Sequence, residues 1–320
     1  MTRKGVKAAG THHLILHQLT AQAPMAPTAL EDDDTEDGEH APLCVLSVNA
    51  SDPSGAGGLS ADILALSALG VHALPVCSGA YVRDSARIED FYPLDADGLA
   101  EQLRAVCEDL QPDAFKLGFA GSPEQLGAVV GLTQDYTDAP LVAYMPDLSW
   151  WSRADIEAYQ DAFADLVLPH CAVLVGHYTA LWHWLLPDWH KARAPTPRDL
   201  AMAAGTHGAD LTLVMGLSHD AAQIDLHVCS PHQVLAHTHT AVPARAALGL
   251  GDSLSAGVAA RLIQTGDAVQ TLNDCAAALS TCLHRAYRPG MGLWLPDHLG
   301  WNQVLTDPAP DPEPTRPALH

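Results

Sequence analysis

The chain has 320 residues, and its 38 acidic and 16 basic side chains give a formal net charge of −22. Nucleic acids and anionic membranes would repel such a chain, so we expect neither as a partner. Hydrophobic residues make up 48% of the sequence, which excludes a wholly disordered chain and allows one large α/β domain or two small ones.

The two ends of the chain differ in composition from the middle. Seven of the nine residues from 31 to 39 are acidic, and such a block repels itself and stays solvated. Residues 307–320 contain five prolines, which forbid a helix or a central strand. We therefore predict a disordered acidic leader over 1–41, one folded body over 42–305 and a proline-rich tail over 306–320.

Within the body, short apolar runs alternate with longer helical patterns. Strands are predicted at 43–48, 73–78, 114–118, 141–144, 173–175 and 211–215. Helices are predicted at 59–69, 97–110, 124–132, around 153–166 and 196–204, and at 252–264 and 268–287. Uniformly apolar strands that alternate with helices predict a mostly parallel sheet covered on both faces. The strand-like stretch 224–242 predicts an antiparallel edge or hairpin.

The cysteines and the apolar stretches limit where the protein works. The chain has seven cysteines, an odd number without a CxxC pair, which argues against a disulfide framework and a zinc site. No apolar run has the length of a signal peptide or a membrane span. We expect a cytoplasmic protein.

A glycine-rich loop joins the first predicted strand to the first predicted helix. It reads Ser-Asp-Pro-Ser-Gly-Ala-Gly-Gly from Ser51 to Gly58. Ligands of open α/β sheets bind beyond the carboxyl ends of the strands, and glycines let the backbone approach them closely. We place Asp62 in the first helical turn, where it either faces a ligand or stabilises the positive helix end. The loop matches neither GxxxxGK[ST] nor GxGxxG.

A second glycine loop opens a helix about 200 residues later, with Gly249-Leu250-Gly251-Asp252. A Gly-x-Gly turn at a helix start presents free N–H groups and the positive end of the helix dipole to an anion. A carboxylate at Asp252 could take the proton of a substrate hydroxyl during phosphoryl transfer. It could equally be an ordinary helix N-cap.

Taken together, these loops resemble those of a known family. The string from Ser51 to Asp62, followed by Ser67-Ala68-Leu69-Gly70-Val71, resembles the opening of the hydroxymethylpyrimidine/phosphomethylpyrimidine kinases of thiamine biosynthesis, members of the ribokinase-like superfamily. The second loop resembles their Gly-x-Gly anion hole. Residues 112–118 and 290–292 resemble further family segments, so the likeness extends over about 43–300.

The resemblance implies an α/β, ribokinase-like fold and ATP-dependent phosphorylation of hydroxymethylpyrimidine or its monophosphate, with ATP and Mg²⁺ as cofactors and a homodimer as assembly. Asp252 would be the catalytic base, and the amides of Gly249, Leu250 and Gly251 would form the anion hole. The substrate-binding residues implied are Asp52, Gly57, Asp62, Arg83 and Lys116.

Several positions depart from the family pattern. Asp252 stands where these pyrimidine kinases usually carry cysteine, Arg83 where they carry glutamine, and Tyr144 where they carry aspartate. The segments 176–180 and 215–218 lack the family's Pro-Asn-x-x-Glu and Lys-Gly-Gly-His, so no metal ligand is assigned. Two alternatives therefore stay open. Asp252 favours a pyridoxal-type kinase, and the other losses favour a catalytically lapsed member that binds a pyrimidine.

Overall fold

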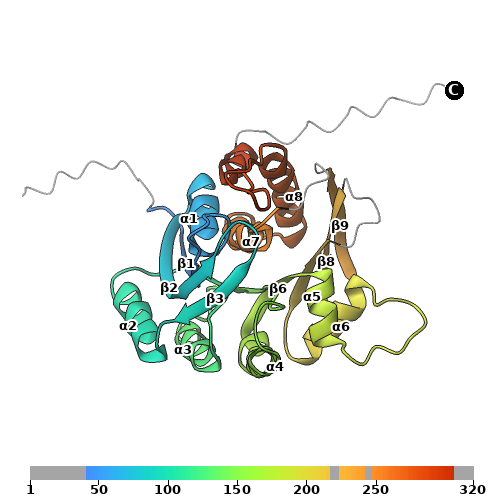
Figure 1. The fold of residues 1–320 in the computed structure, drawn as a ribbon, viewed down its shortest axis with the longest axis horizontal. Helices are drawn as coiled ribbons and strands as arrows, with labels where there is room; N and C mark the ends of the chain where they lie inside the picture. The colour runs from blue at the N-terminus through green and yellow to red at the C-terminus, as the bar shows by residue number, and fades with distance from the viewer. Residues whose placement is uncertain (1–40, 217–222, 242–246, 306–320) are drawn as a thin grey trace, which may run out of the picture. The chain divides into compact units, whose positions relative to one another are not determined.

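The computed structural model describes residues 41–216, 223–241 and 247–305 (Figure 1). Residues 1–40 of the predicted leader and the predicted tail lie outside the described part. Nine strands in the described part form one sheet, in the order β3-β2-β1-β4-β5-β6-β7-β8-β9. Their bounds are β1 Cys44–Ser51, β2 His72–Arg83, β3 Ile88–Pro93, β4 Ala114–Leu117, β5 Leu141–Met145, β6 Cys171–His177, β7 Leu211–Met215, β8 Gln223–Cys229 and β9 Val234–Ala241.

The sheet is parallel from β2 to β7 and antiparallel at its two edges. Strand β3 pairs with β2 in the antiparallel direction, as β8 does with β7 and β9 with β8. The mostly parallel sheet that the apolar runs predict is thus confirmed, and so is the hairpin near 224–242.

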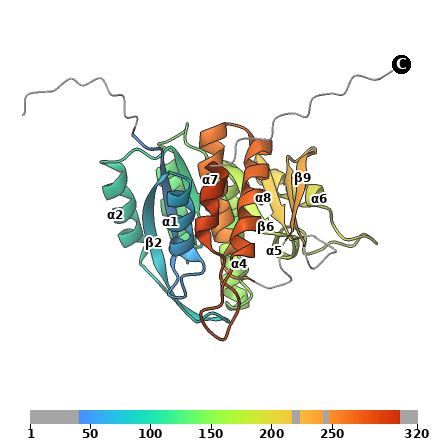
Figure 2. The same cartoon turned by 90° about the horizontal axis from the view of Figure 1, so that it is seen from above.

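Helices cover both faces of the sheet (Figures 1 and 2). One face is covered by α1 Gly58–Ala68, α7 Leu250–Thr265 and α8 Ala268–His284. The other is covered by α2 Ala96–Cys107, α3 Pro123–Thr133, α4 Arg153–Ala162, α5 Tyr178–Leu185 and α6 Pro197–Thr206. Three shorter helical segments are η1 Phe163–Val167, η2 Leu168–His170 and η3 His298–Leu305. None of the helices in the described residues is long and apolar enough to cross a membrane.

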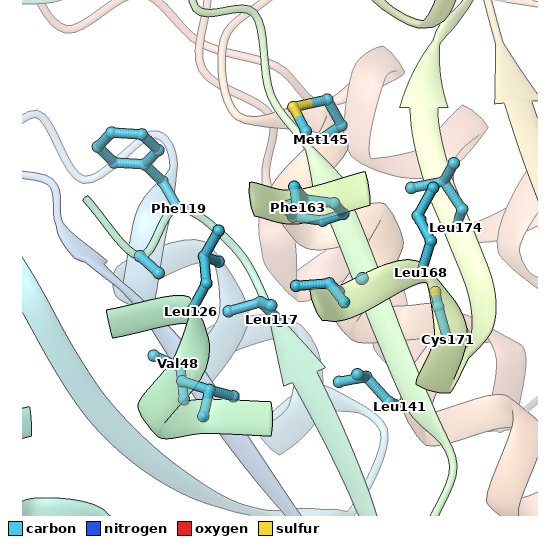
Figure 3. Packing of buried hydrophobic residues seen from close by; sticks show 14 of the residues in the cluster. Val48, Leu117, Phe119, Leu126, Leu141, Met145, Phe163, Leu168, Cys171 and Leu174 are labelled. Atoms are coloured by element: carbon cyan, nitrogen blue, oxygen red, sulfur yellow. The ribbon is translucent and has the colours of Figure 1, made fainter. Parts of the chain in front are cut away.

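Alternate residues of the central strands contribute to two separate cores. In β1, Val45 packs toward α1, α7 and α8, whereas Leu46 and Val48 pack toward the opposite helices. This follows from the two-residue period of a strand, and it explains why the strands are apolar on both sides. Figure 3 shows part of the second core, where Leu117 and Phe119 lie near Leu126 of α3.

Strand β3 and helix α5 were not predicted, and α1 starts one residue earlier than expected. In β3 only Phe91 is buried, so this edge strand has no apolar alternation to reveal it. Helix α5 is short and contains threonine, histidine and tryptophans, which are weak helix formers. Because α1 begins at Gly58, Asp62 is its fifth residue and lies in the second turn.

The strand order brings the two glycine loops to one edge of the sheet. The chain runs outward from β1 to β2 and β3, then returns to β4 on the other side of β1. Open α/β sheets bind ligands at such a reversal, beyond the carboxyl ends of the strands. The first glycine loop follows β1 here, and α7 contacts α1, β4 and β5.

Candidate active site

Asp252 is the polar side chain at which three segments of the chain meet. Its Oδ1 accepts a hydrogen bond from Asn49 Nδ2 at 2.8 Å and lies 3.5 Å from Lys116 Nζ. Its Oδ2 accepts a hydrogen bond from the Gly58 amide at 3.1 Å. The side chain is 19% exposed, so a molecule from solvent can reach a carboxylate whose position is set from three sides.

Beneath Asp252 lies a fully buried ion pair between Lys116 and Asp62. The ammonium of Lys116 is 2.9 and 2.8 Å from the two carboxylate oxygens of Asp62, and neither side chain is exposed. Ser47 Oγ donates a further hydrogen bond to Asp62 Oδ2 at 2.8 Å. Lys116 therefore carries one positive charge between the carboxylates of Asp62 and Asp252.

The surroundings of Asp62 act on its protonation in opposite directions. Burial raises the pKa of Asp62 to about 6, and the nearby Asp252 raises it as well, while Lys116 and the hydrogen bond from Asn49 lower it. At neutral pH the carboxylate is therefore mostly ionised. The carboxylate lies inside the fold against Lys116 and Ser47, in the second turn of α1. The sequence predicts it in the first turn, where it either faces a ligand or stabilises the helix end. A direct contact between Asp62 and a substrate stays a prediction.

Asn49 is a site residue that the sequence did not single out. Its Nδ2 donates to Asp62 Oδ2 at 2.9 Å as well as to Asp252 Oδ1. Its Oδ1 accepts hydrogen bonds from the amides of Ala50 and Phe119 at 2.9 and 3.0 Å, which fixes the orientation of the side-chain amide. Its place at the carboxyl end of β1, just before the glycine loop, is the signal that could have identified it.

The two glycine loops pack directly against each other. Gly249 has a φ of +71°, and a Cβ there would lie 1.7 Å from the carbonyl oxygen of Ala56. The buried His298 of η3 donates from Nε2 to the same carbonyl oxygen, at 3.2 Å. Glycine at 249 thus permits both the left-handed turn and the close approach. The amides of Leu250, Gly251 and Asp252 lie at the start of α7, where backbone N–H groups have no partner within the helix.

Asp52 and Arg83 form a second ion pair beside Asp252. Arg83 Nη1 lies 3.2 Å from Asp52 Oδ2, and the two side chains are 8% and 0% exposed. A Cβ on Gly57 would lie 3.2 Å from this oxygen and 2.8 Å from Asp252 Oδ2, so the two carboxylates face the same glycine. The structure therefore gathers all the predicted site residues around the two loops.

Aromatic side chains occupy positions where the family pattern has polar groups. A Cβ on Gly251 would lie 2.1 Å from the Tyr144 hydroxyl, so the phenol packs against the predicted anion hole. Burial, followed by the charge of Asp252, raises the pKa of Tyr144 well above its ordinary value. In the same way, a Cβ on Gly216 would lie 2.3 Å from His177 Nε2. Within the described residues, no three His, Cys, Asp or Glu side chains are grouped to hold a metal ion.

An aromatic cluster adjoins the acidic groups. The rings of Tyr81 and Phe119 stack, with centroids 5.8 Å apart and planes 17° apart, and Trp150 meets both rings edge-on. Burial and then the charge of Asp252 raise the pKa of Tyr81. The cluster therefore places aromatic rings beside the acidic groups of the site.

Comparison with known proteins identifies relatives for most of the chain. Residues 52–296 match the family model described as phosphomethylpyrimidine kinase. A hydroxymethylpyrimidine/phosphomethylpyrimidine kinase of Mycobacterium leprae is 33% identical over 88 residues, which are 28% of this chain and 32% of that protein. Its Escherichia coli counterpart is 30% identical over 91 residues, 28% of this chain and 34% of that protein. The chain thus spans about a third of the length of the curated relatives it matches.

Solved structures show the same fold. A Staphylococcus aureus pyridoxal kinase in complex with pyridoxal superposes with a TM-score of 0.72 at 17% identity, over 82% of this chain and 96% of that one. A phosphomethylpyrimidine kinase from Clostridium difficile gives a TM-score of 0.59 at 17% identity, over 73% and 97%. The predicted ribokinase-like fold is confirmed.

Proposed function

Because the chain belongs to the phosphomethylpyrimidine kinase family, we propose that it transfers the γ-phosphoryl group of ATP to the hydroxymethyl group of a pyrimidine, or to its monophosphate, in thiamine biosynthesis. The observation that carries this proposal is the partly exposed Asp252 carboxylate at the glycine turn of α7, held by Asn49, Lys116 and the Gly58 amide. The proposal includes a cytoplasmic location and a homodimer.

In the proposed reaction, Asp252 accepts the proton of the substrate hydroxyl while that oxygen bonds to the γ-phosphorus and the bond to ADP breaks. The amides of Leu250, Gly251 and Asp252 stabilise the charge on the transferring oxygens, since a helix start attracts anions. Lys116 and Asn49 keep Asp252 in place, and Asp62 holds Lys116. Asp62 thus positions Asp252 indirectly, through Lys116.

The described residues do not fit a protein-held magnesium ion. Mg²⁺ usually takes one or two carboxylates together with substrate phosphates and waters. Here Tyr144 packs against Gly251 and His177 against Gly216, and the described part of the chain contains no metal-ligand cluster. Mg²⁺ as the counter-ion of ATP remains part of the proposal.

The same two aromatic side chains favour a second candidate, a lapsed member that binds a pyrimidine without transferring phosphate. Tyr144 occupies space beside the anion hole, which leaves less room for a phosphoryl group there. The other alternative, a pyridoxal-type kinase, is favoured by Asp252, since an acid at this position is the commoner choice in the ribokinase-like superfamily that the sequence resembles.

Transfer and binding assays on Asp252→Asn distinguish these candidates. A general base contributes about 10²- to 10⁴-fold to rate, so a kinase should lose most transfer in this variant and still bind the acceptor. The matched control is Asp161→Asn, an exposed carboxylate in α4 on the other face of the sheet, which should keep wild-type transfer. Acceptors to test are hydroxymethylpyrimidine and pyridoxal. Equal transfer by wild type and Asp252→Asn would contradict the assignment of the base.

A further inference from the structure

His298 is a buried histidine that uses one of its two ring nitrogens. The residue is 4% exposed, and its Nε2 lies 3.2 Å from the carbonyl oxygen of Ala56. Its Nδ1 is buried and has no hydrogen-bond partner among the described residues. Burial lowers the pKa of His298, so the ring is neutral at pH 7. Because a carbonyl oxygen can only accept, the single proton of the neutral ring is on Nε2.

The backbone around His298 is anchored to α7 and α8. The amide of Asp297 donates to the carbonyl oxygen of Cys282 in α8 at 3.0 Å. Trp301 is fully buried, and a Cβ on Gly257 of α7 would lie 2.3 Å from its ring. The η3 segment is therefore held against both helices, and it presents the His298 ring to the first glycine loop from a fixed position.

The peptide unit between Ala56 and Gly57 connects this ring to the acidic groups of the site. Its carbonyl accepts from His298, and its N–H, the Gly57 amide, donates to Asp52 Oδ2 at 3.0 Å. A peptide whose carbonyl accepts a hydrogen bond is polarised and donates more strongly through its N–H. The bond from His298 therefore supports the contact to Asp52 and fixes the orientation of this peptide.

The next amide along the loop holds the proposed base. The N–H of Gly58 donates to Asp252 Oδ2 at 3.1 Å, and its direction depends on the peptide before it. The carbonyl oxygen of Ala56 also lies against Gly249, where a Cβ would be only 1.7 Å away. This oxygen thus lies between the start of α7 and the His298 ring, at the point where the two glycine loops meet.

We propose that His298 is a positioning residue of this site: its Nε2–H holds the Ala56 carbonyl and thereby keeps the Gly58 amide on the carboxylate of Asp252. The ring acts through the first glycine loop. A ring that only filled space could be replaced by any side chain of similar volume, whereas this role needs a donor at the place of Nε2. The inference rests on the proposed function for the role of Asp252 as base, and it adds the residue that sets the geometry of that base.

Two amide side chains test this role in the full chain, because they place a donor at different ends of the imidazole. In His298→Gln the terminal NH₂ can reach the place of Nε2, whereas in His298→Asn it lies at the place of Nδ1. Hydrogen–deuterium exchange, followed by mass spectrometry, measures the amides of residues 55–58. They should exchange about 5- to 10-fold faster in His298→Asn, the effect of one lost hydrogen bond, and stay within about 3-fold of wild type in His298→Gln.

Two controls separate a local change from a loss of overall stability. Exchange in α3, on the other face of the sheet, should be the same in wild type and both variants. His232→Asn changes an exposed histidine between β8 and β9, and it should leave exchange at residues 55–58 unchanged.

The kinetics of phosphate transfer give a second readout. In His298→Asn, kcat should fall about 10- to 100-fold while KM for ATP stays within about 3-fold, because a displaced base costs turnover rather than ATP binding. His298→Gln should restore kcat to within about 3-fold of wild type, which a side chain that only fills space would not do selectively.

Nitrogen-15 NMR of the wild-type ring gives a result that needs no variant to fold. The hydrogen bond to Ala56 requires a neutral ring with its proton on Nε2 at pH 7, so a charged ring or a proton on Nδ1 would overturn the inference. Equal exchange in folded His298→Asn and His298→Gln, a rise of the same size in α3, or an unchanged kcat in His298→Asn would do the same. Faster exchange confined to residues 55–58, in a chain that transfers no phosphate, would sink the kinase proposal and leave the contact between His298 and the loop standing.

Discussion

Replacing Lys116 by methionine should destabilise the fold strongly, because the change leaves the buried carboxylate of Asp62 without its counter-ion. Both side chains of this pair are fully buried, with the ammonium 2.8 Å from the carboxylate. Removing one partner of a buried pair costs about 3–5 kcal/mol of unfolding free energy. For a chain of this size the loss corresponds to a fall in melting temperature on the order of 10 °C.

The loss should depend on pH in a direction set by Asp62. Its pKa in the fold is about 6, above the ordinary 3.8, so the folded chain binds a proton more readily between these values. Stability from this group is therefore present at low pH and is lost as pH rises through 6. Without Lys116 the pKa of Asp62 rises further, so the deficit of the variant should be largest above pH 7 and should shrink toward pH 5.

Urea denaturation of wild type and Lys116→Met at pH 5 and pH 7.5 measures both effects. The control is Lys191→Met, an exposed lysine over the Trp189 ring, expected to change stability by less than about 0.5 kcal/mol. The double variant Asp62→Asn/Lys116→Met should recover part of the loss, since neither charge remains. A Lys116→Met deficit below about 1 kcal/mol, or one equal at both pH values, would refute the buried pair.

Three further outcomes are expected. Burial and the stacked His237 ring, 4.1 Å away, lower the pKa of His227 to about 4, so the free energy of unfolding should fall as pH drops from 6.5. His227→Phe should reduce this fall, measured by urea denaturation between pH 7 and 5, by about 1 kcal/mol, a figure discounted for partial exposure. An unchanged slope would contradict this. Gly251→Ala, whose Cβ would meet the Tyr144 hydroxyl, should lower the free energy of unfolding by about 1–3 kcal/mol in wild type and by under about 0.5 kcal/mol in a Tyr144→Ala background. Equal losses in the two backgrounds would contradict the contact. Deleting residues 1–40 should move the melting temperature by only a few degrees, because the acidic block cannot bury enough apolar surface to offset its ordering entropy, and a collapse of stability would place the leader in the fold.

The central strands could be predicted because each carries a continuous apolar run that feeds both cores. Strand β7 was predicted at its observed bounds, Leu211–Met215. Edge strand β3 could not be, because it buries only Phe91 and depends on β2 for its pairing. Its existence is a consequence of tertiary context, which overrides the weak local signal.

The site shows the same division between local and long-range information. The glycine loops can be recognised from the sequence, since their spacing and their position after a strand or before a helix are local features. The polar contacts of the site cannot be recognised in this way, because the ion pair of Asp62 with Lys116 spans 54 positions and the hydrogen bond from Asn49 to Asp252 spans 203. Local sequence also gave no sign that Tyr144 packs against Gly251, a contact made only when α7 lies over β5.

Phosphorus NMR of the wild-type chain, mixed at stoichiometric concentration with ATP, Mg²⁺ and hydroxymethylpyrimidine, tests the proposed function most directly. Transfer to the hydroxymethyl oxygen predicts a new phosphomonoester signal coupled to the two methylene protons, with ADP appearing in equal amount. Unchanged ATP signals, while calorimetry under the same conditions shows saturable binding of the pyrimidine, would contradict the kinase and leave a protein that binds the ring without phosphorylating it.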